Sequence, residues 1–331
     1  MRWLPVLLWL AVAFAVVMYV VMDGFDLGIG ILLPFASSDH DRDIMIQSVA
    51  PFWDGNETWL VLGGTLLIGA LPIAYGVLLP AFYVPLMVML FALIFRGVAF
   101  EYRFRASRLR RNWDAAFSLG SLLAAFCQGL VLGAYIKGVP STDGAFDGGT
   151  LDFLGGFSIV CGFGLIAGYT LLGASWLVLK TSGANAEFGR RTARLALVLT
   201  LAFIVIVSIW TPVAFPYIER RWFSWPDIGL LWPVPLATAL VAYGIWRTLG
   251  GPRDLWPFLL CIGLFLLAFL GLAISLWPFV VPYGVTIWQA ASSESTLIFL
   301  GVGTAIILPI ILGYFAFAHS VFRGKTHTGG G

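Results

Sequence analysis

The chain has 331 residues, of which 60% are hydrophobic and only 11% charged, and its mean hydropathy is +0.94. Soluble globular proteins carry roughly 25% charged residues, so this composition excludes that class and predicts an all-α polytopic membrane protein. The net charge is only +2, and the placement of the charges along the chain is more informative than their sum. We expect no nucleic-acid partner for such a protein.

Nine apolar segments follow one another along the chain. They cover residues 4–34, 52–79, 81–100, 115–137, 152–179, 195–215, 229–248, 256–279 and 297–318. About 20 apolar residues suffice to cross a bilayer, so we expect nine transmembrane helices. The count depends on the second segment, where Trp59 to Leu79 holds 21 residues without a charge, too long and too apolar for a water-exposed loop. We expect a single transmembrane domain over residues 1–320 and a flexible C-terminal tail over residues 321–331.

The distribution of Lys and Arg predicts the orientation. With nine spans and the N-terminus outside, 14 of the 19 cationic residues lie in inside loops. These are Arg42, Arg103, Arg105, Arg108, Arg110, Arg111, Lys180, Arg190, Arg191, Arg194, Arg247, Arg253, Arg323 and Lys325. The outside retains Arg2, Lys137, Arg220 and Arg221. Because cytoplasmic loops carry an excess of Lys and Arg, we expect an outside N-terminus and a cytoplasmic C-terminus.

Two pairs of carboxylates stand out at the inner ends of the first two segments. Asp54 and Glu57 lie in A-P-F-W-D-G-N-E-T-W-L, and Asp23 and Asp26 lie in M-D-G-F-D-L-G. Residues three apart share a helix face. Asp54 and Glu57 either favour the positive end of a helix dipole or form part of an ion path, and their spacing alone does not decide between the two.

The first segment also carries Gly24 and Gly28 in a G-x-x-x-G spacing, which permits close approach of a second helix. We therefore expect its acids to face protein, where they need partners. The spacing is also compatible with simple helix packing.

Arg96 lies inside the third segment and is the natural partner for Asp23 or Asp26. A guanidinium at mid-membrane costs at least about 2.5 kcal/mol unless it is paired. Glu101 and Arg103 follow it, and for these two an extension of the side chains to the interface is a reasonable alternative interpretation. The topology brings the acids of the first two segments and Arg96 to one depth near the cytosol. We expect a polar cluster there that also includes Glu101, and leave open whether it conducts protons or only holds the helices together.

The three histidines, His40, His319 and His327, are expected in loops or the tail. With no histidine in a span we expect no haem ligands and no metal site in this chain. Cys127, Cys161 and Cys261 lie in apolar runs without ligand spacing, which is typical of buried free thiols.

The stretches M-D-G-F-D-L-G (22–28), A-P-F-W-D-G-N-E-T-W-L (50–60), F-R-G-V-A-F-E-Y-R (95–103) and W-P-F-V-V-P (277–282) resemble subunit II of cytochrome bd-type quinol oxidases, including the cyanide-insensitive branch. The similarity covers essentially the whole chain. It implies nine helices in two four-helix bundles with one peripheral helix, in the bacterial inner membrane with the N-terminus periplasmic. It also implies a partner subunit I that carries haem b and haem d, oxidises quinol and reduces dioxygen to water. Accessory membrane subunits, lipid and quinone are further expected partners of that complex.

The resemblance also suggests roles for individual residues. Asp54 matches the aspartate that the family places on a proton uptake route from the cytoplasm, and Trp53 matches the motif tryptophan beside it. Asp26 and Arg96 match positions that the family uses in a buried polar contact. Glu57 and Glu101 stand at motif positions where other members carry different polar residues.

Two alternatives remain open at this stage. One is a proton-coupled secondary transporter, which nine spans and inner acids would permit, although no paired repeat typical of such folds is visible. The other keeps the oxidase complex but makes this chain purely structural, with Asp23, Asp26 and Arg96 as an ion network that holds helices together.

Overall fold

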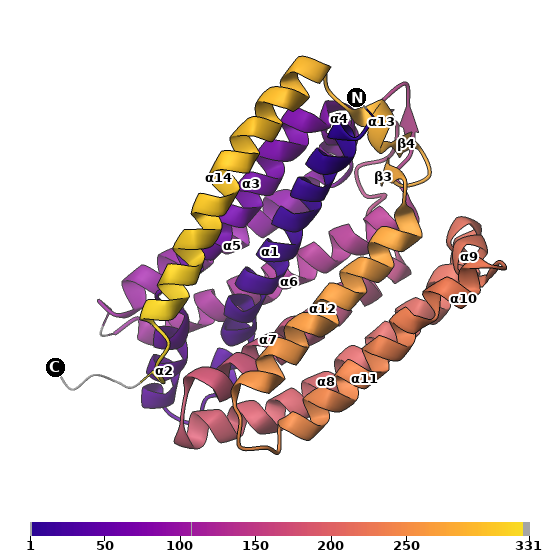
Figure 1. Cartoon of the computed structure of the whole chain (residues 1–331). Helices are drawn as coiled ribbons and strands as arrows, with labels where there is room; N and C mark the ends of the chain where they lie inside the picture. The colour runs from indigo at the N-terminus through magenta and orange to yellow at the C-terminus, as the bar shows by residue number, and fades with distance from the viewer. Residues whose placement is uncertain (1, 107, 327–331) are drawn as a thin grey trace.

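The computed structural model of the chain describes residues 2–106 and 108–326. These residues form a long array of helices with two small β-hairpins at one end (Figure 1). The helices are α1 (Leu4–Leu32), η1 (Leu33–Phe35), α2 (Asp39–Val49), α3 (Trp53–Ala70), α4 (Pro72–Ala81), α5 (Tyr83–Arg103), α6 (Arg110–Lys137), α7 (Gly156–Lys180), α8 (Gly183–Ala214), α9 (Pro216–Phe223), α10 (Asp227–Leu231), α11 (Pro233–Thr248), α12 (Leu255–Leu276), α13 (Ile287–Ala290) and α14 (Glu294–Val321). The antiparallel hairpins pair β1 (Ser141–Thr142) with β2 (Ala145–Phe146) and β3 (Phe279–Val281) with β4 (Val285–Thr286).

Eight stretches within the described residues are helical, long and apolar enough to cross a membrane. They are Leu4–Phe35, Tyr83–Arg103, Arg110–Lys137, Gly156–Lys180, Gly183–Ala214, Asp227–Thr248, Leu255–Leu276 and Glu294–Val321. This confirms a polytopic helical membrane protein. Helix α3 has 18 residues but is not among these spans, since its first two turns carry Asp54, Asn56 and Glu57. The expected ninth span depends on α3.

The expected second segment is not one continuous helix. Helix α3 ends at Ala70, and Leu71 leaves the helical region with φ −130° and ψ 59° before α4 begins at Pro72. A proline disfavours helical geometry in the residue before it, and its missing N–H is no loss at the first position of a new helix. The prediction of an unbroken helix from Trp59 to Leu79 is therefore wrong. The short helix α4 lies at the same end of the molecule as the N-terminus (Figure 1).

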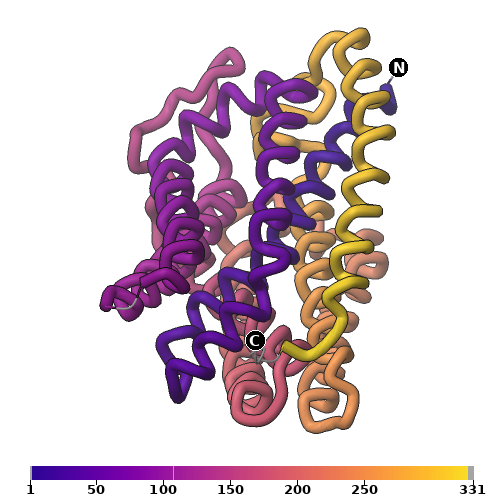
Figure 2. Tube along the Cα trace, turned by 90° about the vertical axis from the view of Figure 1, so that its left-hand side faces the viewer, coloured from indigo at the N-terminus to yellow at the C-terminus, as the bar shows by residue number. Residues whose placement is uncertain are grey.

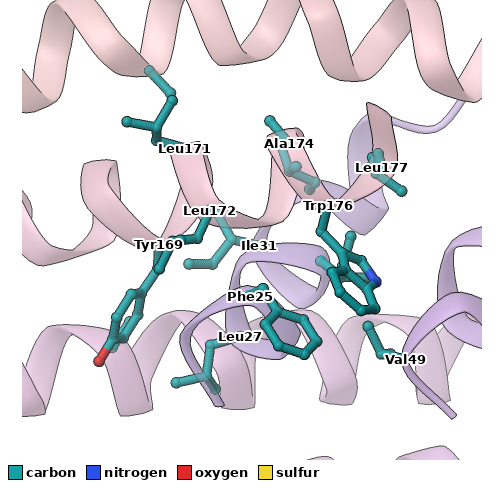
Figure 3. Packing of buried hydrophobic residues seen from close by; sticks show 14 of the residues in the cluster. Phe25, Leu27, Ile31, Val49, Tyr169, Leu171, Leu172, Ala174, Trp176 and Leu177 are labelled. Carbon is teal, nitrogen blue, oxygen red and sulfur yellow. The ribbon is translucent and has the colours of Figure 1, made fainter. Parts of the chain in front are cut away.

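Helix α1 is the central element. It packs against α3, α6 and α7, and from Asp23 to Leu33 every residue is buried. A Cβ atom on Gly28 would lie 2.0 Å from the carbonyl oxygen of Tyr169, so the two backbones approach closely here. Beside this contact, the ring of Phe25 stacks on Trp176 with centroids 4.1 Å apart. Figure 3 shows these two rings among the apolar side chains of α1 and α7, with Val49 of α2 beside them.

The connections between helices gather at two ends of the array. Helix α2, the turns α5–α6, α7–α8 and α11–α12, and the end of α14 lie at one end (Figures 1 and 2). The N-terminus, α4, α9, α13 and the second hairpin lie at the other.

Two local expectations at the C-terminal end differ from the structure. His319 belongs to the last turns of α14 rather than to a loop, with its Nδ1 2.9 Å from the carbonyl oxygen of Phe315. Residues 322–326 of the expected flexible tail make contacts, since Lys325 donates to the carbonyl oxygen of Val178 at 2.9 Å. The remainder of that tail, 327–331 with His327, lies outside the described residues.

Candidate functional site: a buried charge cluster

Three helices each supply a charged side chain to one buried contact. Nη2 of Arg96, on α5, donates to Asp23 of α1 and to Glu57 of α3, each at 2.7 Å. The side chains of Arg96 and Asp23 are 2% and 1% exposed, whereas that of Glu57 is 29% exposed. The guanidinium therefore joins a fully buried acid to one that reaches towards the surface.

Asp26 lies beside this contact and has a neutral partner. The amide nitrogen of Asn56 donates to Asp26 Oδ2 at 2.7 Å and to the carbonyl oxygen of Met22 at 3.1 Å. Both side chains are buried. Asn56 was not among the predicted site residues, although it stands inside the W-D-G-N motif next to Glu57.

The cluster contains more hydrogen-bonding capacity than its own residues use. Within the described chain, buried atoms of the cluster without a hydrogen-bond partner are Asp23 Oδ2, Asp26 Oδ1, Asn56 Oδ1 and Arg96 Nη1. Buried polar groups in proteins are almost always paired with protein or ordered water. These donors and acceptors can therefore hydrogen-bond to water between α1, α3 and α5.

Asp54 lies on the surface next to the cluster, in the first turn of α3 and three residues before Glu57. Its neighbour Trp53 stacks on Phe100 of α5 with centroids 5.3 Å apart. A Cβ on Gly97 would lie 3.3 Å from the Trp53 ring. Trp53 of α3 therefore packs against α5 next to the exposed carboxylate of Asp54.

Glu101 is not part of this cluster. Its side chain is 63% exposed and lies 4.0 Å from Arg105. Arg103 comes seven residues after Arg96, which is almost the same helix face, whereas Glu101 comes five residues after it, on another face. Arg103 is therefore buried like Arg96, and Glu101 is not. The expectation of a cluster that includes Glu101 is therefore wrong.

Arg103 forms a second buried network, so the alternative in which its side chain extends to the interface does not hold. Its Nη1 donates to Asp43 of α2 at 2.7 Å and its Nε donates to Asp114 of α6, while Arg110 also donates to Asp43. Burial by itself raises the pKa of Asp43, but the hydrogen bonds from Arg110 and Arg103 outweigh it and leave that pKa below its ordinary value. This network ties α2 to α5 and α6.

A chain of uncharged polar groups extends from the cluster towards α7. Gln128 of α6 donates to the hydroxyl of Tyr19 at 3.0 Å and accepts from the hydroxyl of Tyr169 at 2.5 Å. Tyr19 stands one helical turn before Asp23 on α1. The predicted site did not include these three residues, although a glutamine inside an apolar helix indicates a buried polar contact.

Gly24 and Gly28 face α7. A Cβ on Gly24 would lie 2.8 Å from the ring of Tyr169, and one on Gly28 would meet the α7 backbone. The three cysteines are buried and free. Across residues 2–106 and 108–326 there is no group of three or more His, Cys, Asp or Glu side chains that could hold a metal ion.

The fold and the cluster define a multi-pass helical membrane protein with ion-paired side chains buried between α1, α3 and α5. The profile of the family described as cytochrome bd terminal oxidase subunit II matches residues 4–322. The chain therefore belongs to this family, as its motifs suggested.

Relatives from several bacteria agree with this assignment. The chain is 28% identical to the cytochrome bd-I ubiquinol oxidase subunit 2 of Escherichia coli K12, over 96% of this chain and 93% of that protein. It is 27% identical to the cytochrome bd ubiquinol oxidase subunit 2 of Bacillus subtilis, over 96% of each. A chain of the bd oxidase structure from Geobacillus thermodenitrificans has the same fold, with a TM-score of 0.78 at 18% identity over 97% of this chain and 99% of that one.

Proposed function

We propose that this chain is the haem-free subunit II of a bd-type quinol oxidase. It packs against a subunit I that holds haem b and haem d, oxidises quinol and reduces dioxygen to water. The family match over residues 4–322 and the named relatives support this proposal. They favour it over the alternative of a proton-coupled secondary transporter.

In this proposal the N-terminus is periplasmic and the C-terminus cytoplasmic. The 14 cations expected inside belong to the end of the helix array that carries α2, the α7–α8 turn and the end of α14. Helix α3 is the ninth span, because it packs along α1 and α14, which are both long enough to cross the membrane. Helices α1, α3, α5 and α6 then form one bundle, α7, α8, α11 and α12 a second, and α14 lies outside them.

The chain also provides a proton uptake route from the cytoplasm that begins at Asp54. This proposal rests on the order in which charged side chains lie between the surface and the interior. Asp54 is exposed, and Glu57 is partly exposed one turn further along α3. Glu57 and buried Asp23 both accept a hydrogen bond from Arg96, whose guanidinium stays charged and holds the two carboxylates close together. Carboxylates and ordered water transfer protons efficiently when they lie within hydrogen-bond reach of one another. Asp26 and Asn56 flank this route.

Replacing Asp54 tests the route. The variant Asp54→Asn keeps the size of the side chain but cannot exchange a proton, so quinol oxidase turnover of the purified complex is expected to fall by about tenfold or more. The amount of assembled complex should be unchanged, because Asp54 is exposed. Oxygen consumption and complex yield must be measured separately.

Glu101→Gln is the matched control, because Glu101 is also an exposed carboxylate near the same end but lies outside the cluster. We expect its turnover to equal that of the unmodified complex. Normal proton-coupled turnover in Asp54→Asn would remove Asp54 from the mechanism. Loss of assembly without loss of turnover per complex would instead make the region purely structural.

A further inference from the structure

Helix α14 ends at the same end of the molecule as α2 (Figure 1). Residues from both helices line a cavity of about 390 Å³ there. The residues that line it come from the end of α2 and the turn to α3, the end of α7, and the end of α14 with the segment after it, and include Gln47, Phe52, Lys180 and Val321. None of these residues takes part in the charge cluster described above.

Lys180 is an unusual residue for such a position. It is only 6% exposed, and lysines are rarely buried unless they are paired. Its Nζ lies 5.5 Å from the centroid of Phe52 and 5.3 Å from that of Trp176, within the range of cation–π contacts. Its one hydrogen bond from Nζ within the described chain goes to the carbonyl oxygen of Phe322. A lysine ammonium can donate three, and no described carboxylate lies within 4.0 Å of it.

The carboxylate that pairs with the neighbouring cation Lys325 does not balance the charge of Lys180. Lys325, which also lines the cavity, is paired with Asp254 at 2.6 Å. Asp254 is already shared with Arg190. The cavity wall therefore holds two cations, of which Lys325 shares its carboxylate with Arg190 and Lys180 has no carboxylate within 4.0 Å among the described residues. This excess of positive charge favours an anion in the cavity.

An apolar surface leads directly to the cavity. Tyr314, Phe317 and Val321 are exposed on α14 at spacings of three and four residues, which places them on one helix face. Val321 is also part of the cavity wall. A ligand with a negatively charged head and long apolar chains would match both features.

We propose that this cavity binds the phosphate headgroup of an anionic phospholipid, with an acyl chain along the α14 face. Basic pockets between transmembrane helices at the cytoplasmic side bind such headgroups. The assignment to the cytoplasmic leaflet depends on the orientation proposed above, whereas the chemistry of the site does not. Since Phe52 is the residue before the first turn of α3, the bound headgroup would also support the position of α3.

The experiment compares lipid binding by purified complexes. The chain, purified with its partner subunit, is stripped of lipid and mixed with palmitoyl-oleoyl phosphatidylglycerol or phosphatidylcholine, and bound lipid is counted by native mass spectrometry. We expect a preference for phosphatidylglycerol that falls by about fivefold or more in Lys180→Gln, from the loss of one interfacial cation.

Arg323→Gln is the matched control, because Arg323 is a nearby exposed cation that does not line the cavity. It should keep the preference. If Lys180→Gln fails to assemble, Gln47→Glu tests the same site, since it leaves Lys180 in place and adds a negative charge to the wall. An equal preference in Lys180→Gln and the unmodified complex would overturn the proposal. The proposal would also be overturned if the complex bound inorganic phosphate but showed no preference for phosphatidylglycerol over phosphatidylcholine.

Discussion

At the scale of single residues, the molecule places charges in its interior and compensates them locally. Arg96 has two carboxylate partners and Arg103 has two, whereas among the described residues Asp26 has only the amide of Asn56. Isolated charges inside proteins or membranes are strongly unfavourable. The stability of the array should therefore depend on keeping these pairs intact.

Removing Arg96 should destabilise the complex more than removing Glu57. Arg96→Gln leaves buried Asp23 without its cation, and breaking a buried ion pair from one side costs about 3–5 kcal/mol. Glu57→Gln should cost less, because Glu57 is partly solvated. The midpoint of heat inactivation and the yield of assembled complex measure both effects.

A double variant separates loss of the pair from loss of packing. Asp23→Asn combined with Arg96→Gln removes both charges, so it should be more stable than Arg96→Gln alone. If the double variant were no more stable, the uncompensated charge of Asp23 would not be the cause of the damage.

The contact of Asp43 with Arg103 and Arg110 predicts a pH dependence of stability. The pKa of Asp43 is lower in the folded chain than its ordinary value, which is about 3.9 in an unfolded chain. Its contribution is therefore fully present above that value and is lost as the pH falls through the folded-state pKa. Asp43→Asn should lower the heat-inactivation midpoint at pH 7, and the difference from the unmodified complex should shrink below about pH 4.

Asp39→Asn serves as the control for Asp43, because Asp39 lies on the same helix but is 58% exposed in its pair with Arg42. Exposed pairs contribute about 0–1 kcal/mol, so its effect should be small at every pH. A deficit in Asp43→Asn that stayed constant down to pH 3 would contradict the ion-pair explanation.

At the scale of secondary-structure elements, close backbone contact between α1 and α7 positions much of the interior. Gly28 on α1 meets Gly173 on α7, where a Cβ on either would lie within 3.0 Å of the other helix's backbone. Small residues permit such approach between membrane helices. The apolar rings of Phe25 and Trp176 then fill the space beside it (Figure 3).

Gly28→Ala should impair assembly. Its added Cβ would lie 2.0 Å from the Tyr169 carbonyl oxygen, a backbone atom that cannot rotate away. Overpacking typically costs about 1–3 kcal/mol, so heat inactivation should occur at lower temperature and less complex should be recovered. Gly64→Ala is the control, since a Cβ there meets nothing within 4 Å. Equal stability of the two variants would show that α1 and α7 can move apart without loss.

At the scale of the whole molecule, the charged residues separate the two ends of the helix array. The end that holds α2 and the α7–α8 turn carries most of the cations, whereas the end that holds the N-terminus and α4 carries few. The same separation makes the orientation in the membrane testable.

Labelling at the two ends should reveal that orientation. An impermeant maleimide should label Thr150→Cys in spheroplasts without permeabilisation, and Ala184→Cys only after it, because the positive-inside rule places the latter in the cytoplasm. Both positions are exposed, and the native cysteines are buried, so the background should be low. The opposite pattern of labelling would reverse the proposed orientation.

The amino-acid sequence by itself determined the class of the protein, its family and most of its spans, because twenty consecutive apolar residues have few alternatives to crossing a bilayer. It also indicated Arg96 and the acids of α1 as partners, since a charge inside a span requires compensation. What hydropathy missed was the break at Leu71, although Pro72 marks it locally.

Only the tertiary structure decided which polar groups meet. The rotation of each helix about its axis determines whether a side chain faces a neighbour, and the packing of glycines and rings at distant positions sets that rotation. For this reason Asn56 and Arg103 lie inside, Glu101 lies outside, and Gln128 joins two tyrosines that are 150 residues apart in sequence. Such contacts depend on several helices at once, so they cannot be predicted from the sequence of a single apolar segment.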